Sequence, residues 1–105
     1  DYKIIWSRFS EQQIDEIYEY YKNRVNSKLA KKIVKSIIIA PDNLIKNPKI
    51  GVVEPLSAHR EIEYRYIVTT NDKVIYSVNE NDRSIRIADV FDTRQNPIKI
   101  EQRIK

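Results

Sequence analysis

The fold is decided by residues 61–92, which read EIEYRYIVTTNDKVIYSVNENDRSIRIADVFD. Apolar and polar side chains alternate in three runs along this stretch, and a period of two is typical of strands with one buried face. The apolar positions are Ile62, Tyr64, Tyr66 and Val68 in the first run, Val74, Tyr76 and Val78 in the second, and Ile85, Ile87 and Phe91 in the third. Residues 70–72 and 79–82, rich in Asn and Asp, separate the runs as turns. The stretch therefore predicts three consecutive strands in an antiparallel meander.

The meander is preceded by two runs with the period of an amphipathic helix. In the first, Ser10 followed by Gln13 forms a capping box, and the helix is expected to end near Asn26. A second helix starts at Asn26 or Ser27 and is kinked or interrupted by Pro41. Because only a residue or two separates the helices, they must fold back as an antiparallel hairpin.

Two further segments complete the pattern. Residues 2–6, YKIIW, are rich in β-branched and aromatic side chains and predict a first strand that joins the meander. Residues 49–59, which hold the only glycine, lack a clear period and are interpreted as a connecting loop. The element order is then β-α-α-β-β-β. It predicts an α+β fold, with an antiparallel sheet packed against a two-helix hairpin, as a single domain over residues 1–105.

Composition narrows the class of partner and the compartment. The chain has 19 Lys and Arg against 15 Asp and Glu, a net charge of +4, which favours an acidic or polyanionic partner. It has no cysteine, which excludes disulfides and thiolate sites, and we expect a cytoplasmic location. The longest apolar run, Ile37 to Ala40, is far shorter than the ~20 residues that cross a bilayer, and no signal sequence is recognisable. We therefore expect no membrane partner.

The residues present also exclude several kinds of catalytic centre. His59 is the only histidine, and no spacing of His, Asp and Glu suggests a metal site around it. A lone histidine in a loop is more often a surface residue than a catalyst. The chain has no Gly-x-Ser-x-Gly elbow, and its single glycine, Gly51, excludes the glycine-rich loops that cradle phosphates. We expect neither a metal nor a small-molecule cofactor.

The two predicted helices carry opposite charges. The second has lysines at three- and four-residue steps, namely Lys28, Lys31, Lys32 and Lys35. The first has four carboxylates, namely Glu11, Asp15, Glu16 and Glu19. The lysine stripe could meet phosphates. The preferred interpretation is that the two helices offset each other's charge along a solvated seam.

Two arginines are candidates for binding phosphate. Arg65 lies in mid-strand and by alternation points away from the tyrosines beside it, onto the less apolar face. Arg94 follows the last strand, where a sheet end presents side chains from a rigid base. Two guanidiniums suit bidentate contacts, and near a scissile RNA phosphate they would stabilise developing negative charge. The structural alternative pairs Arg65 with Asp89 or Glu63, and Arg94 with Asp92.

Four segments are more specific than the pattern of elements. They are KIIWS at Lys3–Ser7, NPKIG at Asn47–Gly51, YRYIV at Tyr64–Val68, and VFDTRQNP at Val90–Pro97, of which the last is the most specific. In this order and spacing, over nearly the whole chain, they resemble the RelE/ParE toxins. The resemblance implies the β-α-α-β-β-β RelE/ParE-like fold and the toxin component of a bacterial type II toxin-antitoxin, or plasmid stabilisation, system.

The family it resembles includes toxins that cut mRNA on the ribosome and toxins that inhibit DNA gyrase. The RNA cutters work without metal, activating the ribose 2′-hydroxyl for attack on the next phosphate, and so need an acid, a base and cationic clamps. By resemblance, Arg65 matches the family's mid-strand arginine and Arg94 lies close to its later basic position. Glu54 resembles the glutamate base of the YoeB branch, and His59 is the other candidate for proton transfer.

Departures from the RNA-cutting branches favour the gyrase type. Lysines that the RelE branch carries before the mid-strand arginine are replaced by Glu-Ile-Glu at 61–63, and two carboxylates would repel RNA. The proton donor of those branches has no counterpart, because Arg94 is followed by Gln-Asn-Pro at 95–97. We therefore expect a ParE-like toxin that inhibits a cellular target such as DNA gyrase. The alternatives are a ribosome-dependent mRNA endoribonuclease and a degenerate, non-toxic antitoxin-binding module.

The resemblance also implies a cognate antitoxin. Together with the basic net charge, it predicts a partner whose acidic, partly disordered segment folds onto the sheet and helix surface on binding.

Overall fold

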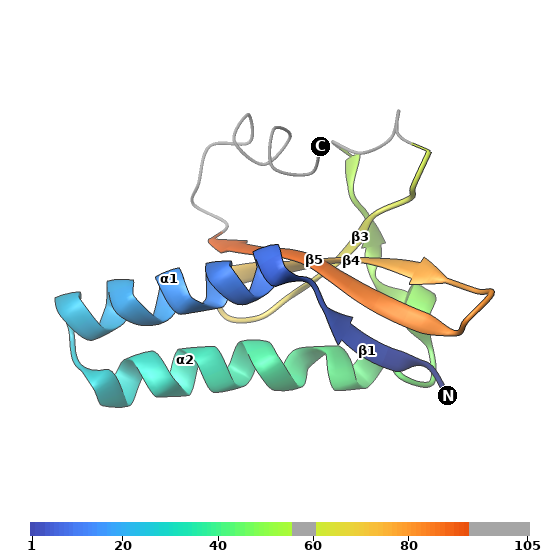
Figure 1. The fold of residues 1–105 in the computed structure, drawn as a ribbon. Helices are drawn as coiled ribbons and strands as arrows, with labels where there is room; N and C mark the ends of the chain where they lie inside the picture. Colours follow the sequence, from blue (N-terminus) through green and yellow to red (C-terminus); the bar gives the residue numbers. More distant parts are fainter. Residues whose placement is uncertain (56–60, 93–105) are drawn as a thin grey trace.

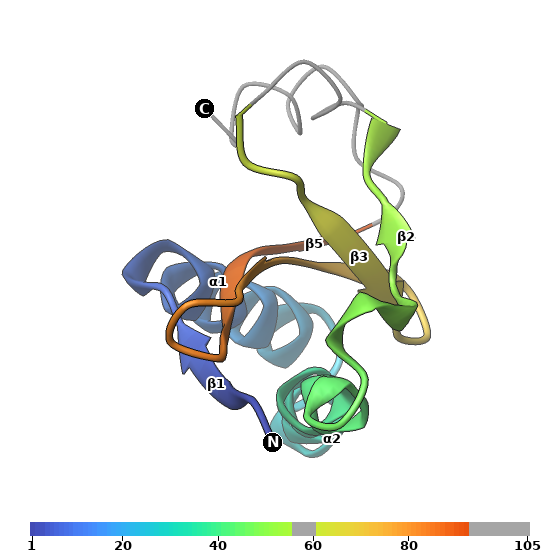
Figure 2. The same ribbon diagram turned by 90° about the vertical axis from the view of Figure 1, so that its right-hand side faces the viewer.

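The computed structural model describes residues 1–55 and 61–92, in which two helices lie on one side of a twisted sheet (Figures 1 and 2). The helices are α1 (Arg8–Arg24) and α2 (Ser27–Ile39), followed by the 3-10 turns η1 (Ala40–Leu44) and η2 (Pro48–Ile50). The strands are β1 (Lys3–Trp6), β2 (Val52–Val53), β3 (Arg65–Val68), β4 (Asp72–Asn79) and β5 (Ser84–Asp92). Within the described residues, no helix has both the length and the apolar composition that a bilayer crossing requires.

The strands form one sheet in the order β1-β5-β4-β3-β2. The predicted meander is confirmed, because β3, β4 and β5 pair antiparallel in sequence order. The α+β class and the helix hairpin are confirmed as well. The sheet is mixed rather than wholly antiparallel, since β1 pairs parallel with β5, from Lys3 opposite Ser84 to Trp6 opposite Ile87. The interpretation of residues 49–59 as loop was wrong at Val52–Val53, which pair with β3 as a short edge strand.

The helix boundaries follow local capping and proline. The first helix begins earlier than the Ser10–Gln13 box predicted, because the N-cap is Ser7, whose Oγ accepts from the Ser10 backbone N–H at 3.1 Å. Asn26 is confirmed as the start of the second helix, and its Oδ1 accepts from the Leu29 N–H at 2.8 Å. The interruption at Pro41 is also confirmed, since α2 gives way to η1 at Ala40.

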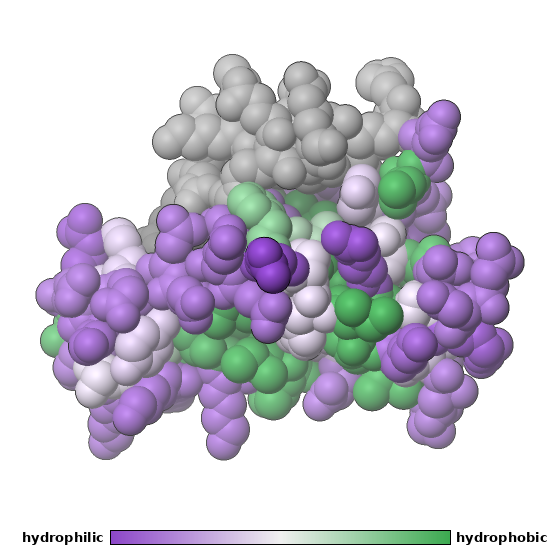
Figure 3. Space-filling model, viewed as in Figure 1, coloured by the Kyte–Doolittle hydropathy of each residue, from purple (hydrophilic) through white to green (hydrophobic). Residues whose placement is uncertain are grey.

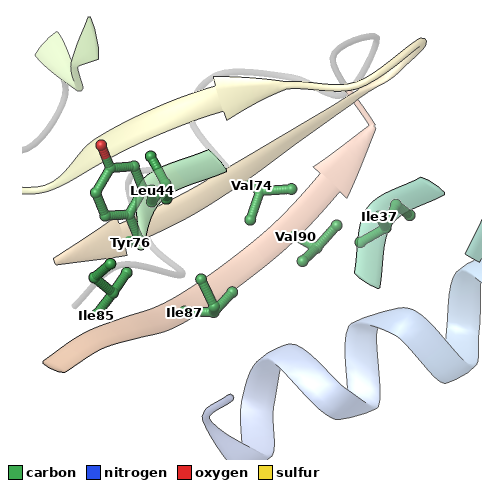
Figure 4. Close-up of a cluster of buried hydrophobic side chains, with 7 residues drawn as sticks. All are labelled: Ile37, Leu44, Val74, Tyr76, Ile85, Ile87 and Val90. Atoms are coloured by element: carbon green, nitrogen blue, oxygen red, sulfur yellow. The ribbon is translucent and has the colours of Figure 1, made fainter. Parts of the chain in front are cut away.

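The main core lies between the helices and one face of the sheet (Figure 4). Its fully buried members come from α2, η1, β4 and β5, namely Ile37, Leu44, Val74, Tyr76, Ile85, Ile87 and Val90. The opposite face of the sheet, here called the distal face, holds a smaller cluster in which Ile75 and Phe91 pack with Tyr64 and Tyr66. The sheet is therefore apolar on both sides.

A β-bulge decides which residues of β5 enter the main core. Ile75 lies opposite Asp89 while Tyr76 lies opposite Ile87, so Ala88 is an extra residue on β5. The extra residue inverts the alternation, which places Val90 in the main core with Ile87 and turns Phe91 to the distal face. The prediction that Phe91 shares a face with Ile85 and Ile87 was therefore wrong.

The Tyr2 hydroxyl ties the start of the chain to the β4–β5 turn by donating to Glu80 Oε2 at 2.5 Å. This hydrogen bond holds the pKa of Glu80 below its usual 4.5 and the pKa of Tyr2 above its usual 10.0. A lowered carboxyl pKa adds stability that is lost as pH falls below about 4.5, and a raised phenol pKa adds stability that is lost as pH rises past 10.0.

We expect Tyr2→Phe to lower the free energy of unfolding between these limits, and the free energies of variant and wild type to converge outside them. Urea unfolding at a series of pH values checks this, and a difference that is flat across the whole range would contradict it.

Candidate functional site

Arg65 extends from β3 to the turn between η2 and β2. Its Nη1 donates to the carbonyl oxygens of Lys49 and Gly51, at 3.1 and 2.9 Å, and its Nη2 lies 3.0 Å from Glu63 Oε1. The side chain is only 19% exposed. The predicted alternative in which Arg65 pairs with Glu63 is therefore realised. This guanidinium fastens one segment of the chain to another.

Arg65 points away from Tyr64 and Tyr66, as alternation predicted, but the face on which it lies is the one that carries the main core. Its register partner is Tyr76, a member of the main core, and Ile67 two residues later packs against the same core. The prediction that Arg65 lies on the less apolar face was therefore wrong. The tyrosines on either side of it point to the distal face, where the small cluster around Phe91 buries them in part.

Tyr76 holds the same turn from within the core. Its hydroxyl donates to the Pro48 carbonyl oxygen at 2.6 Å and accepts from the Gly51 N–H at 3.0 Å. Figure 4 shows the hydroxyl pointing away from the apolar side chains around the ring. Burial raises the pKa of this phenol above its usual value, so the hydroxyl stays protonated and keeps donating. Residues 48–51 are thus clamped by a tyrosine and an arginine together.

Glu54 follows β2 and is buried, with 2% of its surface exposed. Lys73 Nζ on β4 lies 3.6 Å from Glu54 Oε2 and 4.1 Å from the centroid of the Tyr66 ring. Because Tyr66 belongs to the distal cluster, the Glu54–Lys73 pair lies on the distal side of the sheet. The carboxylate is thus held by an ion pair to a lysine that lies over an aromatic ring, and it is not presented to solvent.

The structure therefore separates the two predicted site residues that it describes. Arg65 lies on the helix side of the sheet and Glu54 on the distal side, so the two do not converge on one atom of a substrate. The other two predicted residues, His59 and Arg94, lie outside the described residues. The predicted pairing of Arg94 with Asp92 also falls there. No group of three or more His, Cys, Asp or Glu within residues 1–55 and 61–92 could hold a metal ion.

Two hollows border these residues. The one beside Arg65, of about 400 Å³, is lined by Lys49, Glu61, Ile62, Glu63, Arg65, Val78 and Glu80. Its three carboxylates against two cations make it unsuited to a phosphate backbone. A second hollow, of about 440 Å³ on the distal face, is lined by Ser7, Arg8, Phe9, Ile62, Tyr64, Ser77, Arg86, Ala88 and Asp89. Positive charge on the distal side thus comes from Arg8, Arg86 and Lys73.

Sequence reasoning missed Lys73 and Arg86 as neighbours of a candidate site. Both alternate with core residues, since Lys73 precedes Val74 and Arg86 stands between Ile85 and Ile87. A period of two places such residues on the face opposite the core. The alternation in the sequence is therefore a signal that places both residues on the distal face.

The chain is similar to known toxins of toxin-antitoxin systems. The chain matches the ParE toxin family of type II toxin-antitoxin systems over residues 4–97. The chromosomal ParDE toxin-antitoxin system of P. aeruginosa has a similar structure, with a TM-score of 0.71, 17% identity, and coverage of 87% of this chain and 95% of that chain. The toxin-antitoxin complex RelBE2 of Mycobacterium tuberculosis has a TM-score of 0.56, 11% identity, and coverage of 90% and 93%. At these identities the structural likeness shows the fold alone. No curated protein gives a significant match.

Proposed function

The chain belongs to the ParE toxin family of type II toxin-antitoxin systems, and from this premise we propose that it acts by binding and inhibiting DNA gyrase rather than by cutting mRNA. The observation that carries the proposal is the separation of Arg65 from Glu54 by the thickness of the sheet. Metal-free RNA cleavage needs a proton acceptor at the attacking hydroxyl and a cation at the adjacent phosphate. These groups have to meet at one site.

The environment of Arg65 supports the same conclusion. The guanidinium has two backbone carbonyl oxygens and a carboxylate as partners, so that binding a phosphate would require it to release the 48–51 turn. The hollow beside it also carries Glu61, Glu63 and Glu80. Carboxylates around a cation weaken its attraction for a polyanion. Arg65 is thus a structural residue in this proposal.

Glu54 is equally unsuited to act as a general base. A base must come within hydrogen-bond reach of the substrate hydroxyl, and a side chain that is 3% exposed and paired with Lys73 does not reach a substrate without rearrangement. The endoribonuclease alternative would then rest on Arg94 and His59.

A cognate antitoxin is the second part of the proposal. Family membership supports it, and the two similar structures are described as toxin-antitoxin systems or complexes. An acidic antitoxin segment would be attracted by the net charge of +4. We expect antitoxin binding to neutralise the toxin.

Two assays on the purified chain test the target. We expect it to block supercoiling of relaxed plasmid by DNA gyrase, and to leave mRNA intact on translating ribosomes. Addition of the cognate antitoxin should restore supercoiling, which controls for non-specific inhibition. Ribosome-dependent mRNA cleavage would overturn the proposal in favour of the endoribonuclease. Neither activity, together with unimpaired growth on expression, would point to a non-toxic antitoxin-binding module.

A further inference from the structure

The outer surface of the helix hairpin carries two stripes of opposite charge. The basic stripe on α2 consists of Lys28, Lys31, Lys32 and Lys35, all of them exposed. The acidic stripe on α1 consists of Glu11, Asp15, Glu16 and Glu19, also all exposed. At 100° per residue each set falls on the side of its helix opposite the buried positions, Ala30 and Ile37 in α2 and Ser10 in α1. Both stripes therefore face away from the sheet.

No ion pair joins the two stripes within the described part of one chain. The helices pack side by side as an antiparallel hairpin (Figure 1). The ion pairs found in the described part of the chain join Lys46 to Asp1, Lys49 to Glu80, Arg65 to Glu63 and Lys73 to Glu54. None of them links α1 to α2. The interpretation of the stripes as a charge-compensated seam between the helices is therefore not realised as ion pairs.

The stripes are matched in height along the hairpin. Glu19 stands five residues before the end of α1, and Lys32 stands five residues after the start of α2. Glu16 and Lys35 are each eight residues from the same points. With about 1.5 Å of rise per residue in both helices, Lys32 lies level with Glu19 and Lys35 lies level with Glu16.

This arrangement is self-complementary under one two-fold rotation. A two-fold axis that runs along the hairpin, between the helices and over their outer surface, places α1 of one copy above α2 of the other at the same height. Acidic residues then lie over lysines twice, once on each side of the axis. A two-fold axis across the hairpin would instead place α1 over α1, where like charges repel.

We propose that this surface is an interface between two copies of the chain, joined through their helix hairpins about the axis along the hairpin. The apolar part of the proposed interface would come from the same outer surface of the hairpin. Ile38 and Ile39 follow the lysines on α2 and are 48% and 53% exposed. Figure 3 shows apolar side chains at the surface between hydrophilic ones over the two helices. Burying this apolar area would add to the charge pairing.

A nucleic acid fits the surface less well than a second copy does. The acidic stripe lies on the helix that packs beside the one carrying the lysines. A polyanion lying on the lysines would be repelled by these carboxylates. A surface with acidic and basic stripes at matched heights is suited to a partner whose stripes lie in the inverse order. A second copy of the chain, rotated about the two-fold axis, presents that inverse order.

The test is sedimentation of the full-length toxin, which does not depend on its target. We expect the wild type to self-associate at ~10 mM salt, where the Debye length is ~30 Å, and to dissociate towards monomer at ~1 M, where it is ~3 Å. The variants Glu16→Lys/Glu19→Lys and Lys32→Glu/Lys35→Glu each place like charges across the axis. Each should weaken self-association by at least about tenfold. Mixing the two variants should restore a dimer, because both helices of one variant are then basic at the matched heights and both helices of the other are acidic, so that both pairings across the axis are attractive.

Three outcomes would overturn the proposal. One is a monomeric wild type at ~10 mM salt. Another is self-association that both charge-reversed variants retain unchanged. The third is a monomer in which Lys32→Glu/Lys35→Glu weakens binding of the antitoxin or of duplex DNA, which would assign the surface to that partner. The substitution Glu61→Lys, at an exposed residue before β3 and on neither helix, is the control and should leave self-association within about twofold of the wild type.

Discussion

Replacing Gly51 by alanine is expected to destabilise the fold by about 3 kcal/mol, through overpacking and the loss of a hydrogen bond. A Cβ at this position would collide with the Tyr76 hydroxyl and would lie 2.8 Å from both the Tyr66 carbonyl oxygen and Tyr76 Cε1. Two of the obstacles belong to a fully buried ring and the third to backbone, so none moves aside easily. Gly51 has φ −68° and ψ 159°, which any residue adopts. The cost comes from the close approach alone.

Urea unfolding of Gly51→Ala against the wild type measures this cost. Ile50→Ala, at a neighbouring side chain that is 52% exposed, is the matched control and is expected to change stability by about 0.5 kcal/mol or less. Tyr76→Phe removes the colliding oxygen together with its bonds to Pro48 and Gly51. The double variant should therefore lose less than the sum of the two single variants. An unchanged unfolding midpoint for Gly51→Ala would show that the turn does not press against Tyr76.

Replacing Lys73 by methionine is expected to destabilise the fold by about 3 kcal/mol, because it leaves the Glu54 carboxylate buried without its cation. The lysine also gives up its place over the Tyr66 ring, 4.1 Å from the centroid. This loss of stability lies at the low end of the range for a broken buried ion pair, since the Lys73 side chain is 26% exposed and partly hydrated. Methionine retains most of the apolar stem, so the loss reports the charge.

Glu54→Gln separates the structural role of this pair from a catalytic one. With the carboxylate neutralised, Lys73→Met should cost less in the Glu54→Gln background than in the wild type, as measured by urea unfolding of the four proteins of the cycle. If the pair is structural, the Glu54→Gln variant should still inhibit gyrase under assay conditions in which it is folded. A folded Glu54→Gln variant that has lost all toxicity would contradict the structural assignment and revive Glu54 as a reacting group.

The strand pattern could be predicted from the sequence because alternation and turn residues are local. The meander, the helix hairpin and the start of α2 at Asn26 all follow from such signals. The bulge at Ala88 could not be predicted, since nothing in the sequence marks an extra residue in a strand that reads as continuous. Its consequence, Phe91 on the distal face, was missed with it. Val52–Val53 were missed because two residues next to a glycine carry no period.

The candidate site depended on non-local contacts and was predicted less well. The sequence offered Arg65 with Glu63 or Asp89 as partners but not the carbonyl oxygens of Lys49 and Gly51, which became acceptors only when the chain folded. The burial of Glu54 likewise follows from β2 joining the sheet edge, an element whose two residues carry no pattern that distinguishes it from a loop. Resemblance could name residue types at matching positions. It could not tell which face of the sheet each would occupy.

The position of β5 has a consequence for how the protein is made. The last strand of the described residues, β5, lies inside the sheet, with β1 on one side and β4 on the other. A nascent chain that has not yet released β5 from the ribosome therefore has an N-terminal strand without a neighbour, and the order of synthesis cannot be the order of assembly. Truncation before residue 84 would remove the element on which both halves of the sheet depend. Chains that end before β5 therefore carry exposed strand edges, which favour aggregation and degradation over a folded toxin.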